Sequence, residues 1–377
     1  MTHEPQNPGT RLLVGGSAAY GRMWQLIADA RESIELETYI FKAGSVGEEF
    51  LRRLTAAAAR GVRVRVLVDA YGSGELPDEY FDRLVAAGGD VRRFNPKRLL
   101  RLSFRNHRKL LCCDGVAIAG GLNIADEYDG DGLERGWRDF AVEVGGAVAI
   151  ALRQSFERMW DLAPFGQAEV RAFWLGRPRV TSAAPDMPQL LLSGPGCPTA
   201  ELRRQLVADL RRSRRFRGWA AYFLPSRRVG AAIREAARRG DAAIMLGTRS
   251  DVPLSLWASE RLFTRYLGAG LRIHRYRPQI VHAKALVADD VVYIGSTNLD
   301  VRSLLINYEL LLRIPSPSLA EELRQEFAAD VSRADSLDAR SWSAGRRWWQ
   351  TLRSYFAHLL LARVDPYVAA RKLSSLR

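Results

Sequence analysis

The feature that most restricts the fold of this chain is a short polar motif that occurs twice. The first copy begins at His107 and reads His-x-Lys-x4-Asp, and the second begins at His282 with the same spacing. In each copy a small-residue pair and an asparagine follow, and the histidine and asparagine are separated by the same number of residues. An ordinary solvated strand would explain one copy, but repetition of several spacings indicates two similar folding units.

The spacing within each motif places a histidine and a lysine on the same face of a β-strand. Side chains two residues apart in a strand point the same way, so His107 neighbours Lys109 and His282 neighbours Lys284. A lysine ammonium repels a metal cation but binds a phosphate well. An adjacent imidazole can attack phosphorus or donate a proton. Each motif therefore predicts half of a phosphoryl-transfer site that needs no metal.

The residues around each motif extend this hypothesis. Asn123 and Asn298 lie at the end of the next predicted strand, where their amide groups are expected to bind phosphoryl oxygens. The motif aspartates Asp114 and Asp289 each come just before a turn, which favours a structural role over a chemical one. The predicted catalytic set consists of the six motif residues His107, Lys109, Asp114, His282, Lys284 and Asp289.

A second repeated phrase predicts one more functional pair. Arg-Gln-x-Phe occurs at residues 153–156 and 324–327, and alignment on it places Asp139 opposite Glu309 within one residue. A carboxylate bonded to an imidazole fixes its tautomer and supports its charged form. Asp139 and Glu309 are therefore predicted to orient the two histidines, with two unrelated strand-end acids as the alternative.

Strand and helix patterns alternate along both halves of the chain, which is typical of an α/β sheet covered by helices. In the second half, for example, a helix is predicted at residues 200–215 and a strand at 219–224. A chain of 377 residues is too long for one typical core. The predicted division is a first domain at residues 1–175, a proline-containing linker at 176–189, a second domain at 190–335 and a tail at 336–377.

Positive charge is in excess and is concentrated near the end of the sequence. The 56 Lys and Arg against 42 Asp and Glu give a net charge of +14, which indicates an anionic partner, either nucleic acid or a phospholipid surface. Residues 340–377 hold eight basic side chains and one aspartate, or +7 (8 − 1). Trp348, Trp349 and Phe356 recur there at helical spacing, which suits a helix in a membrane interface. A helix packed on the domain explains the same pattern.

Two further observations concern the compartment. The polar N-terminus has no secretory pattern, and no stretch approaches the ~20 apolar residues of a spanning helix, so any membrane contact is expected to be peripheral. Three cysteines, with Cys112 beside Cys113, form no disulfide framework and indicate a reducing compartment.

The two motifs resemble the paired HKD motifs of the phospholipase D superfamily. From Gly15 to about Arg333 the chain is similar to bacterial cardiolipin synthases of the short type without N-terminal membrane anchors. The double motif is highly specific for the superfamily and much less so for the substrate. Other stretches that carry the resemblance are Glu37-Thr38-Tyr39-Ile40-Phe41, Gly120-Gly121-Leu122-Asn123-Ile124, Ser250-Asp251-Val252-Pro253 and Gly295-Ser296-Thr297-Asn298.

This resemblance implies two tandem phospholipase D-like α/β/α sandwich domains related by a pseudo-two-fold axis, plus the basic helical tail. It implies transfer of a phosphatidyl group to phosphatidylglycerol, making cardiolipin, without a metal or other cofactor. His107 would be the nucleophile that forms a phosphohistidine and His282 the acid and base, an order that sequence symmetry alone does not decide. The phosphatidyl donor is either a second phosphatidylglycerol or phosphatidylethanolamine. The expected location is peripheral, on the cytoplasmic side of the bacterial membrane.

Two other functions remain open from the sequence. One is a phospholipase D-type lipid hydrolase, in which water accepts the phosphatidyl group. The other is a nucleic-acid phosphodiesterase that uses the same histidines and the basic surface. The basic, aromatic tail and the extent of the similarity favour lipid over nucleic acid, and the sequence does not indicate an oligomeric state.

Overall fold

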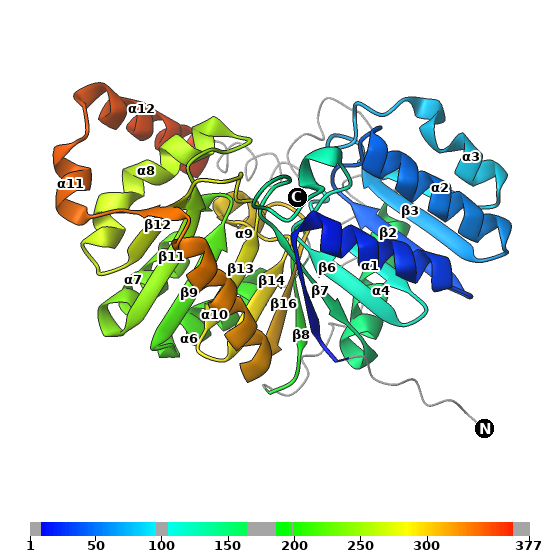
Figure 1. Ribbon diagram of the computed structural model, residues 1–377, viewed down its shortest axis with the longest axis horizontal. Coiled ribbons are helices and arrows are strands. Elements are labelled where there is room, and N and C mark those ends of the chain that lie inside the picture. The colour runs from blue at the N-terminus through cyan, green and yellow to red at the C-terminus, as the bar shows by residue number, and fades with distance from the viewer. Residues whose placement is uncertain (1–8, 96–104, 164–185, 196, 198, 365–377) are drawn as a thin grey trace.

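The computed structural model describes residues 9–95, 105–163, 186–195, 197 and 199–364. Two mixed β-sheets lie next to each other, and helices cover their outer faces (Figure 1). The first half of the chain is drawn in blue to cyan and the second in green to orange. This arrangement confirms the predicted α/β class.

In the first half, a sheet of seven strands has the order β1-β7-β6-β5-β2-β3-β4. Strands β2, β3 and β4 are parallel, whereas β5, β6 and β7 form an antiparallel meander. The strands are β1 Arg11–Val14, β2 Ser33–Thr38, β3 Arg63–Asp69, β4 Asp90–Phe94, β5 Leu110–Cys113, β6 Val116–Gly120 and β7 Phe140–Val144. The α-helices are α1 Gly15–Asp29, α2 Ser45–Ala59, α3 Asp82–Ala86 and α4 Gly146–Leu162.

The second half repeats this topology in an eight-stranded sheet with the order β17-β12-β11-β9-β13-β14-β16-β8. A short parallel pair, β10 Phe223–Leu224 and β15 Leu299–Asp300, lies apart from it. The sheet strands are β8 Gln189–Ser193, β9 Arg215–Ala220, β11 Asp241–Gly247, β12 Arg272–Tyr276, β13 Lys284–Ala288, β14 Val291–Gly295, β16 Glu309–Pro315 and β17 Ala334–Ser336. The helices are α6 Thr199–Arg212, α7 Arg227–Arg239, α8 Pro253–Leu267, α9 Val301–Leu305, α10 Pro317–Val331, α11 Ala339–Ala344 and α12 Trp348–Leu359.

Two boundaries differ from the sequence prediction. The helix expected at residues 200–215 ends at Arg212, and strand β9 begins at Arg215 rather than at Trp219. The arginines of this segment alternate with buried residues at the start of the strand, so their charge concealed a strand pattern. Most of the predicted linker lies outside the described residues, and its last residue already begins β8.

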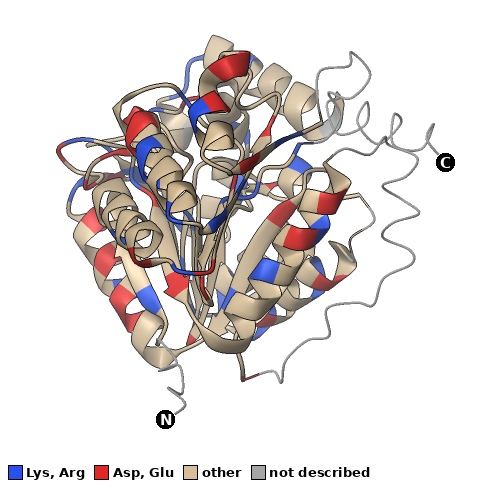
Figure 2. Ribbon diagram, turned by 90° about the vertical axis from the view of Figure 1, so that its right-hand side faces the viewer, with Lys and Arg blue, Asp and Glu red and all other residues tan. Residues whose placement is uncertain are grey.

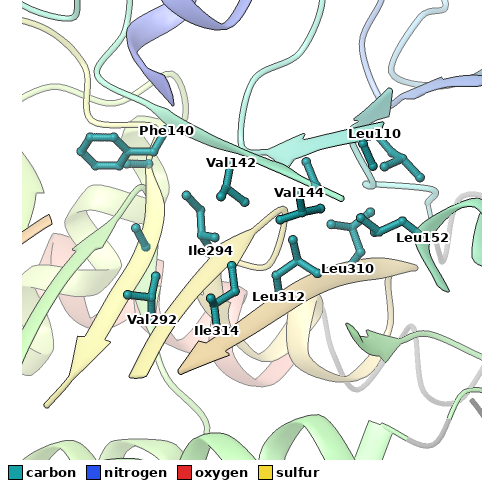
Figure 3. Packing of buried hydrophobic residues seen from close by; sticks show 14 of the residues in the cluster. Leu110, Phe140, Val142, Val144, Leu152, Val292, Ile294, Leu310, Leu312 and Ile314 are labelled. Carbon is teal, nitrogen blue, oxygen red and sulfur yellow. The ribbon is translucent and has the colours of Figure 1, made fainter. Parts of the chain in front are cut away.

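The two halves are joined by a continuous hydrophobic core. Side chains of β7 in the first sheet face those of β14 and β16 in the second, as Figure 3 shows. Burial of each such side chain stabilises the fold by about 1.5–3 kcal/mol, so separation of the halves would be costly. The residues labelled there include Val142, Val144, Ile294, Leu310, Leu312 and Ile314.

A buried ion pair also crosses between the halves. The Nε of Arg138, in the first half, donates to an Asp330 carboxylate oxygen of α10 at 3.0 Å, and Trp219 Nε1 donates to the same oxygen at 2.8 Å. Arg138 is 2% exposed and also pairs with Glu326, whereas Asp330 is fully buried, so loss of Arg138 would leave Asp330 as an uncompensated buried charge.

The two motif aspartates anchor equivalent turns at the far end of each motif strand. The Asp114 carboxylate accepts hydrogen bonds from the backbone N–H groups of Arg31, Glu32 and Ser33, which lead into β2. Asp289 accepts from the backbone N–H groups that lead into β9. Both aspartates have positive φ, 48° and 50°, a conformation that Asp tolerates better than most residues.

The tail contains two helices that pack on the second half. Helix α12 lies along α8, where Ala357 is buried against Ala258 and Leu224 (Figure 1). Arg353 of α12 pairs with Glu260 of α8 at 3.3 Å. No helix among the described residues is long and apolar enough to cross a bilayer.

We expect Asp114→Ala to lower the free energy of unfolding by about 2 kcal/mol, because three backbone donors lose a charged acceptor and Ala disfavours the positive φ. Asp114→Asn, which tolerates that φ, should cost less. Chemical denaturation measures both effects. As a control, Asp78→Ala removes a fully exposed carboxylate and should leave the unfolding midpoint unchanged. Equal midpoints for wild type and Asp114→Ala would contradict the anchoring role.

Candidate active site

The two motif histidines lie at the interface between the halves, and each contacts a carboxylate from the opposite half. His107 Nδ1 is 3.0 Å from Glu309 Oε1, and His282 Nδ1 is 2.7 Å from Asp139 Oδ2. Both carboxylates are fully buried, and the histidines are 9% and 3% exposed. The structure therefore brings together the residues that the sequence paired, with the carboxylates exchanged between the repeats.

Reciprocal backbone bonds produce this exchange. The backbone N–H of His107 donates to Tyr308 O at 3.0 Å, and Tyr308 N–H donates back to Arg105 O at 2.9 Å. In the matching position, the N–H of His282 donates to Arg138 O at 2.9 Å, and Arg138 N–H donates to Ile280 O at 2.8 Å. Tyr308 and Arg138 directly precede Glu309 and Asp139. The same backbone pattern thus delivers one carboxylate to each histidine.

The two motif lysines are buried beside these histidines. Lys109 is 4% and Lys284 5% exposed. The Nζ of Lys109 donates to His107 O at 2.7 Å, and the Nζ of Lys284 is 2.6 Å from His282 Nδ1. Burial and the charge of Lys284 lower the pKa of Lys109 to about 7. A phosphodiester anion would offset part of this positive charge, so the two lysines favour binding of such a group.

The two orienting carboxylates differ in charge. Burial acts to raise the pKa of Asp139, but the charge of Lys284 and the hydrogen bond of His282 hold that pKa below its usual value. Burial raises the pKa of Glu309 to about 8, even though Lys109 and Ser296 oppose the shift. At pH 7 Asp139 is therefore an anion, whereas the Glu309 carboxyl is mostly neutral.

This difference separates the two histidines. Burial, followed by the charges of Lys109 and Lys284, lowers the pKa of His107 well below its usual value, so this imidazole is neutral. Burial and Lys284 also lower the pKa of His282, but its hydrogen bond to anionic Asp139 acts in the opposite direction. Of the two, His282 is better able to carry a proton once a substrate anion offsets the lysines.

The small residues beside the two carboxylates differ between the halves. A Cβ on Gly121 would lie 2.2 Å from Asp139 Oδ1, so only glycine leaves room for that carboxylate. At the matching position, the Ser296 hydroxyl donates to Glu309 Oε2 at 2.5 Å. The small residues after each motif therefore leave room for the carboxylate that follows from the neighbouring strand of the same sheet.

The asparagines take less symmetrical positions than the sequence suggested. The Asn123 side-chain N–H donates to the Tyr128 hydroxyl at 2.6 Å, and its oxygen accepts from Ile40 N–H at 3.1 Å. Asn298 Oδ1 is buried without a hydrogen-bond partner among the described residues. Phosphate binding by either amide stays a prediction.

Several aromatic residues at the site were missed by the sequence analysis. Tyr128 and Trp137 flank His282 with ring centroids 5.0 and 5.4 Å away, and the Tyr128 hydroxyl is 3.3 Å from His282 Nε2. Tyr39 lies beside His107 at 4.9 Å. Tyr128 stands within an acidic stretch that is typical of solvated loops, and its one distinguishing signal was an aromatic residue among acids. Within the described ranges, no group of three or more His, Cys, Asp or Glu is arranged to hold a metal ion.

Comparison with known proteins agrees with this geometry. The family model described as "Cardiolipin synthase, PLD-like domain" matches residues 23–160 and 206–331, one segment in each half. The chain belongs to this family. It is a cardiolipin synthase-like enzyme of the phospholipase D superfamily, as the sequence predicted.

Similar proteins in this family include two bacterial enzymes. The cardiolipin synthase of Geobacillus kaustophilus is 32% identical over 339 residues, which cover 87% of this chain and 67% of that protein. Cardiolipin synthase A of Pseudomonas putida is 32% identical over 358 residues, covering 90% of this chain and 72% of that protein.

Solved structures show how widely the phospholipase D-like fold of this family occurs. The phosphatidylserine synthase of Haemophilus influenzae superposes with a TM-score of 0.72 at 14% identity, covering 97% of this chain and 96% of that one. A polyphosphate kinase from Porphyromonas gingivalis gives 0.58 at 15% identity, over 84% of this chain and 49% of that one. This likeness confirms the predicted pair of phospholipase D-like domains.

For this cardiolipin synthase-like enzyme, Asp139→Asn and Glu309→Gln are expected to differ in effect. Asp139→Asn removes an anion that supports protonated His282 and should lower kcat near pH 7 by about a hundredfold. Glu309→Gln replaces a neutral carboxyl with a neutral amide and should cost less than about tenfold there. Above about pH 8, where Glu309 ionises in the wild type, kcat of Glu309→Gln should differ from the wild-type kcat by a larger factor than at pH 7. Profiles of kcat against pH for both variants measure this. Equal losses at pH 7 would contradict the difference in charge.

Proposed function

We propose that this enzyme transfers a phosphatidyl group from a donor phospholipid to phosphatidylglycerol, producing cardiolipin through a phosphohistidine intermediate. The observation that carries the proposal is the pair of buried histidines, each in contact with a carboxylate of the opposite half and set beside a buried lysine. The family and the 32% identity to cardiolipin synthases support the lipid substrate.

In the first step, neutral His107 attacks the donor phosphorus. A P–N bond forms as the P–O bond to the donor head group breaks, and His282 protonates the departing alcohol oxygen. Lys109 and Lys284 balance the negative charge on the phosphoryl oxygens, so no step requires a metal ion.

In the second step, the hydroxyl of phosphatidylglycerol attacks the phosphohistidine. His282, now neutral, takes the hydroxyl proton while a new P–O bond forms and the P–N bond to His107 breaks. The enzyme returns to its starting state with His282 protonated. Burial of both histidines favours transfer to the lipid alcohol over attack by water.

Distribution of charge bears on the nucleic-acid alternative. On the side of the molecule viewed in Figure 2, basic and acidic residues are interspersed along the helices. Interspersed charges of both signs suit a nucleic-acid backbone less well than a basic stripe does. Lipid hydrolysis remains the second candidate, because water can replace the acceptor in the same site, and the donor is either phosphatidylglycerol or phosphatidylethanolamine.

A donor labelled in its glycerolipid part should leave label on the protein that is stable to alkali and labile to acid. His107→Ala should abolish this label, because it removes the nucleophile. His282→Ala, given a donor whose leaving alcohol needs no proton, should still become labelled and should then release the label slowly. Label on His107→Ala together with none on His282→Ala would reverse the two roles.

We further propose that helix α12 rests on the membrane surface. Its contact with α8 uses small and polar side chains such as Ala357 and Arg353, whereas its large apolar side chains point to solvent. Apolar stripes usually face a core, so a stripe that faces outward suits a lipid interface. These exposed residues are Trp348, Trp349, Leu352, Tyr355, Phe356 and Leu359, and Leu360 directly after the helix is exposed as well.

The position of α12 supports a link to the active site. Ala357 packs against Leu224 of β10, and β10 pairs with β15, which begins directly after Asn298. Contact with the bilayer would thus bring lipid close to the second motif, with arginines of the tail attracted to anionic head groups at about 1 kcal/mol each.

The double variant Trp348→Gln, Phe356→Gln should weaken binding to anionic vesicles by about tenfold or more, because it removes two exposed apolar anchors. Activity on a short-chain, soluble phospholipid and the melting temperature should stay unchanged. Vesicle sedimentation, the soluble assay and thermal melting test this together. Ile150→Gln, at an exposed site on α4, serves as the control. Undiminished vesicle binding by the double variant would contradict the membrane role.

A further inference from the structure

The active site departs from its internal symmetry at one charged position. Arg105 stands two residues before His107, and Ile280 stands two residues before His282. Their backbone oxygens are equivalent, because each accepts the reciprocal hydrogen bond from the opposite half. The second motif therefore lacks a counterpart of the Arg105 side chain. Residues present in both halves are suited to the catalytic steps that the two substrates share. A residue present in one half alone is suited to recognise a feature of one substrate.

Arg105 is held beside His107 by two tyrosines. Its NH1 donates to the Tyr39 hydroxyl at 2.9 Å, and its guanidinium carbon lies 4.0 Å from the ring centroid of Tyr71. The Tyr39 ring in turn lies 4.9 Å from the His107 ring. Arg105 is thus separated from His107 by a single aromatic ring, and its charge contributes to the lowered pKa of His107.

The guanidinium retains capacity to bind an anion. Its Nε is buried without a hydrogen-bond partner, and no carboxylate in the described part of the chain forms an ion pair with it, although its charge acts on the buried Asp69. Stacking on Tyr71, which is 54% exposed, places the group at the rim of the site rather than in the core. A planar guanidinium in this setting is suited to a phosphate.

The proposed reaction needs a second phosphate at this place. The donor phosphorus lies between the two histidines, but the acceptor phospholipid carries a phosphate of its own, separated from the reacting hydroxyl by a three-carbon bridge. We infer that Arg105, held by Tyr39 and Tyr71, binds the phosphate of the acceptor phospholipid. This inference rests on the proposed function and adds to it a determinant of acceptor specificity.

A carboxylate near the second motif favours one orientation of the acceptor. Asp251 is exposed and accepts a hydrogen bond from the Tyr222 hydroxyl at 2.6 Å. Its charge acts on His282 and Lys284. An acceptor phosphate is repelled from Asp251 and attracted to Arg105, while the acceptor hydroxyls can donate to the carboxylate.

A comparison of acceptors tests this role. With one labelled donor, Arg105→Gln should raise KM for phosphatidylglycerol about ten- to a hundredfold. Hydrolysis of the donor and transfer to glycerol, which has no phosphate, report any effect of the lost charge on His107 and should fall much less than transfer to phosphatidylglycerol. Arg105→Lys keeps the charge and should recover part of the loss. Tyr71→Leu, at the exposed rim, should give a smaller rise in the same KM and carries the test if Arg105→Gln does not fold.

Arg52→Gln provides the matched control, because it removes the same charge from the exposed face of α2 and should change none of these rates. Parallel losses with all acceptors in Arg105→Gln would assign Arg105 to the donor phosphate and overturn the inference, while leaving the transfer reaction intact. An unchanged KM would also overturn it. A wild-type protein that transfers to neither acceptor would overturn the proposed function itself.

Discussion

The hydrogen bond between each motif histidine and a carboxylate of the opposite half is the constraint on which the site depends. Neither half contains both members of a pair, so His107 meets Glu309 and His282 meets Asp139 only when the sheets pack together. The hydrophobic core between β7, β14 and β16 supplies the free energy for that packing. Folding of the interface and assembly of the chemistry are therefore one event.

Concentration of positive charge in a buried space is the main cost of this design. Two lysines are almost fully buried in one site, and the lowered pKa of Lys109 reflects the cost of burial and of the nearby Lys284 charge. Ionised Asp139 compensates part of the charge, whereas a fully ionised Glu309 would neutralise the site and weaken its attraction for phosphate. Holding Glu309 mostly protonated at pH 7 leaves net positive charge for the substrate to balance.

Much of the fold and the central residues could be predicted from the sequence, because duplication displays them twice. His107, Lys109, His282 and Lys284 follow from spacing alone, and the shared phrase near residues 153 and 324 located the two carboxylates. Their exchange between halves could not be predicted, since a pseudo-two-fold axis leaves no trace in local sequence. Tyr128 was missed because tertiary packing buries it within an acidic segment, and the start of β9 was misplaced because arginines occupy its exposed positions. The outward direction of the α12 apolar stripe is likewise set by packing against α8, which periodicity does not reveal.

Differences between the two halves give the two histidines different roles. Two identical His-carboxylate pairs would have equal pKa values, and neither histidine would be favoured as nucleophile or acid. Close to the reacting atoms, Lys284 and His282 keep Asp139 ionised whereas burial keeps Glu309 mostly neutral, which breaks that equivalence. Arg105 against Ile280 breaks it at the rim, and α12 breaks it at the surface by covering only the second half. These departures correspond to the three roles proposed above, which are proton transfer, binding of the acceptor phosphate and contact with the bilayer. In a duplicated fold, the residues common to both halves can thus conserve one reaction, while the residues that differ determine which substrate binds on each side.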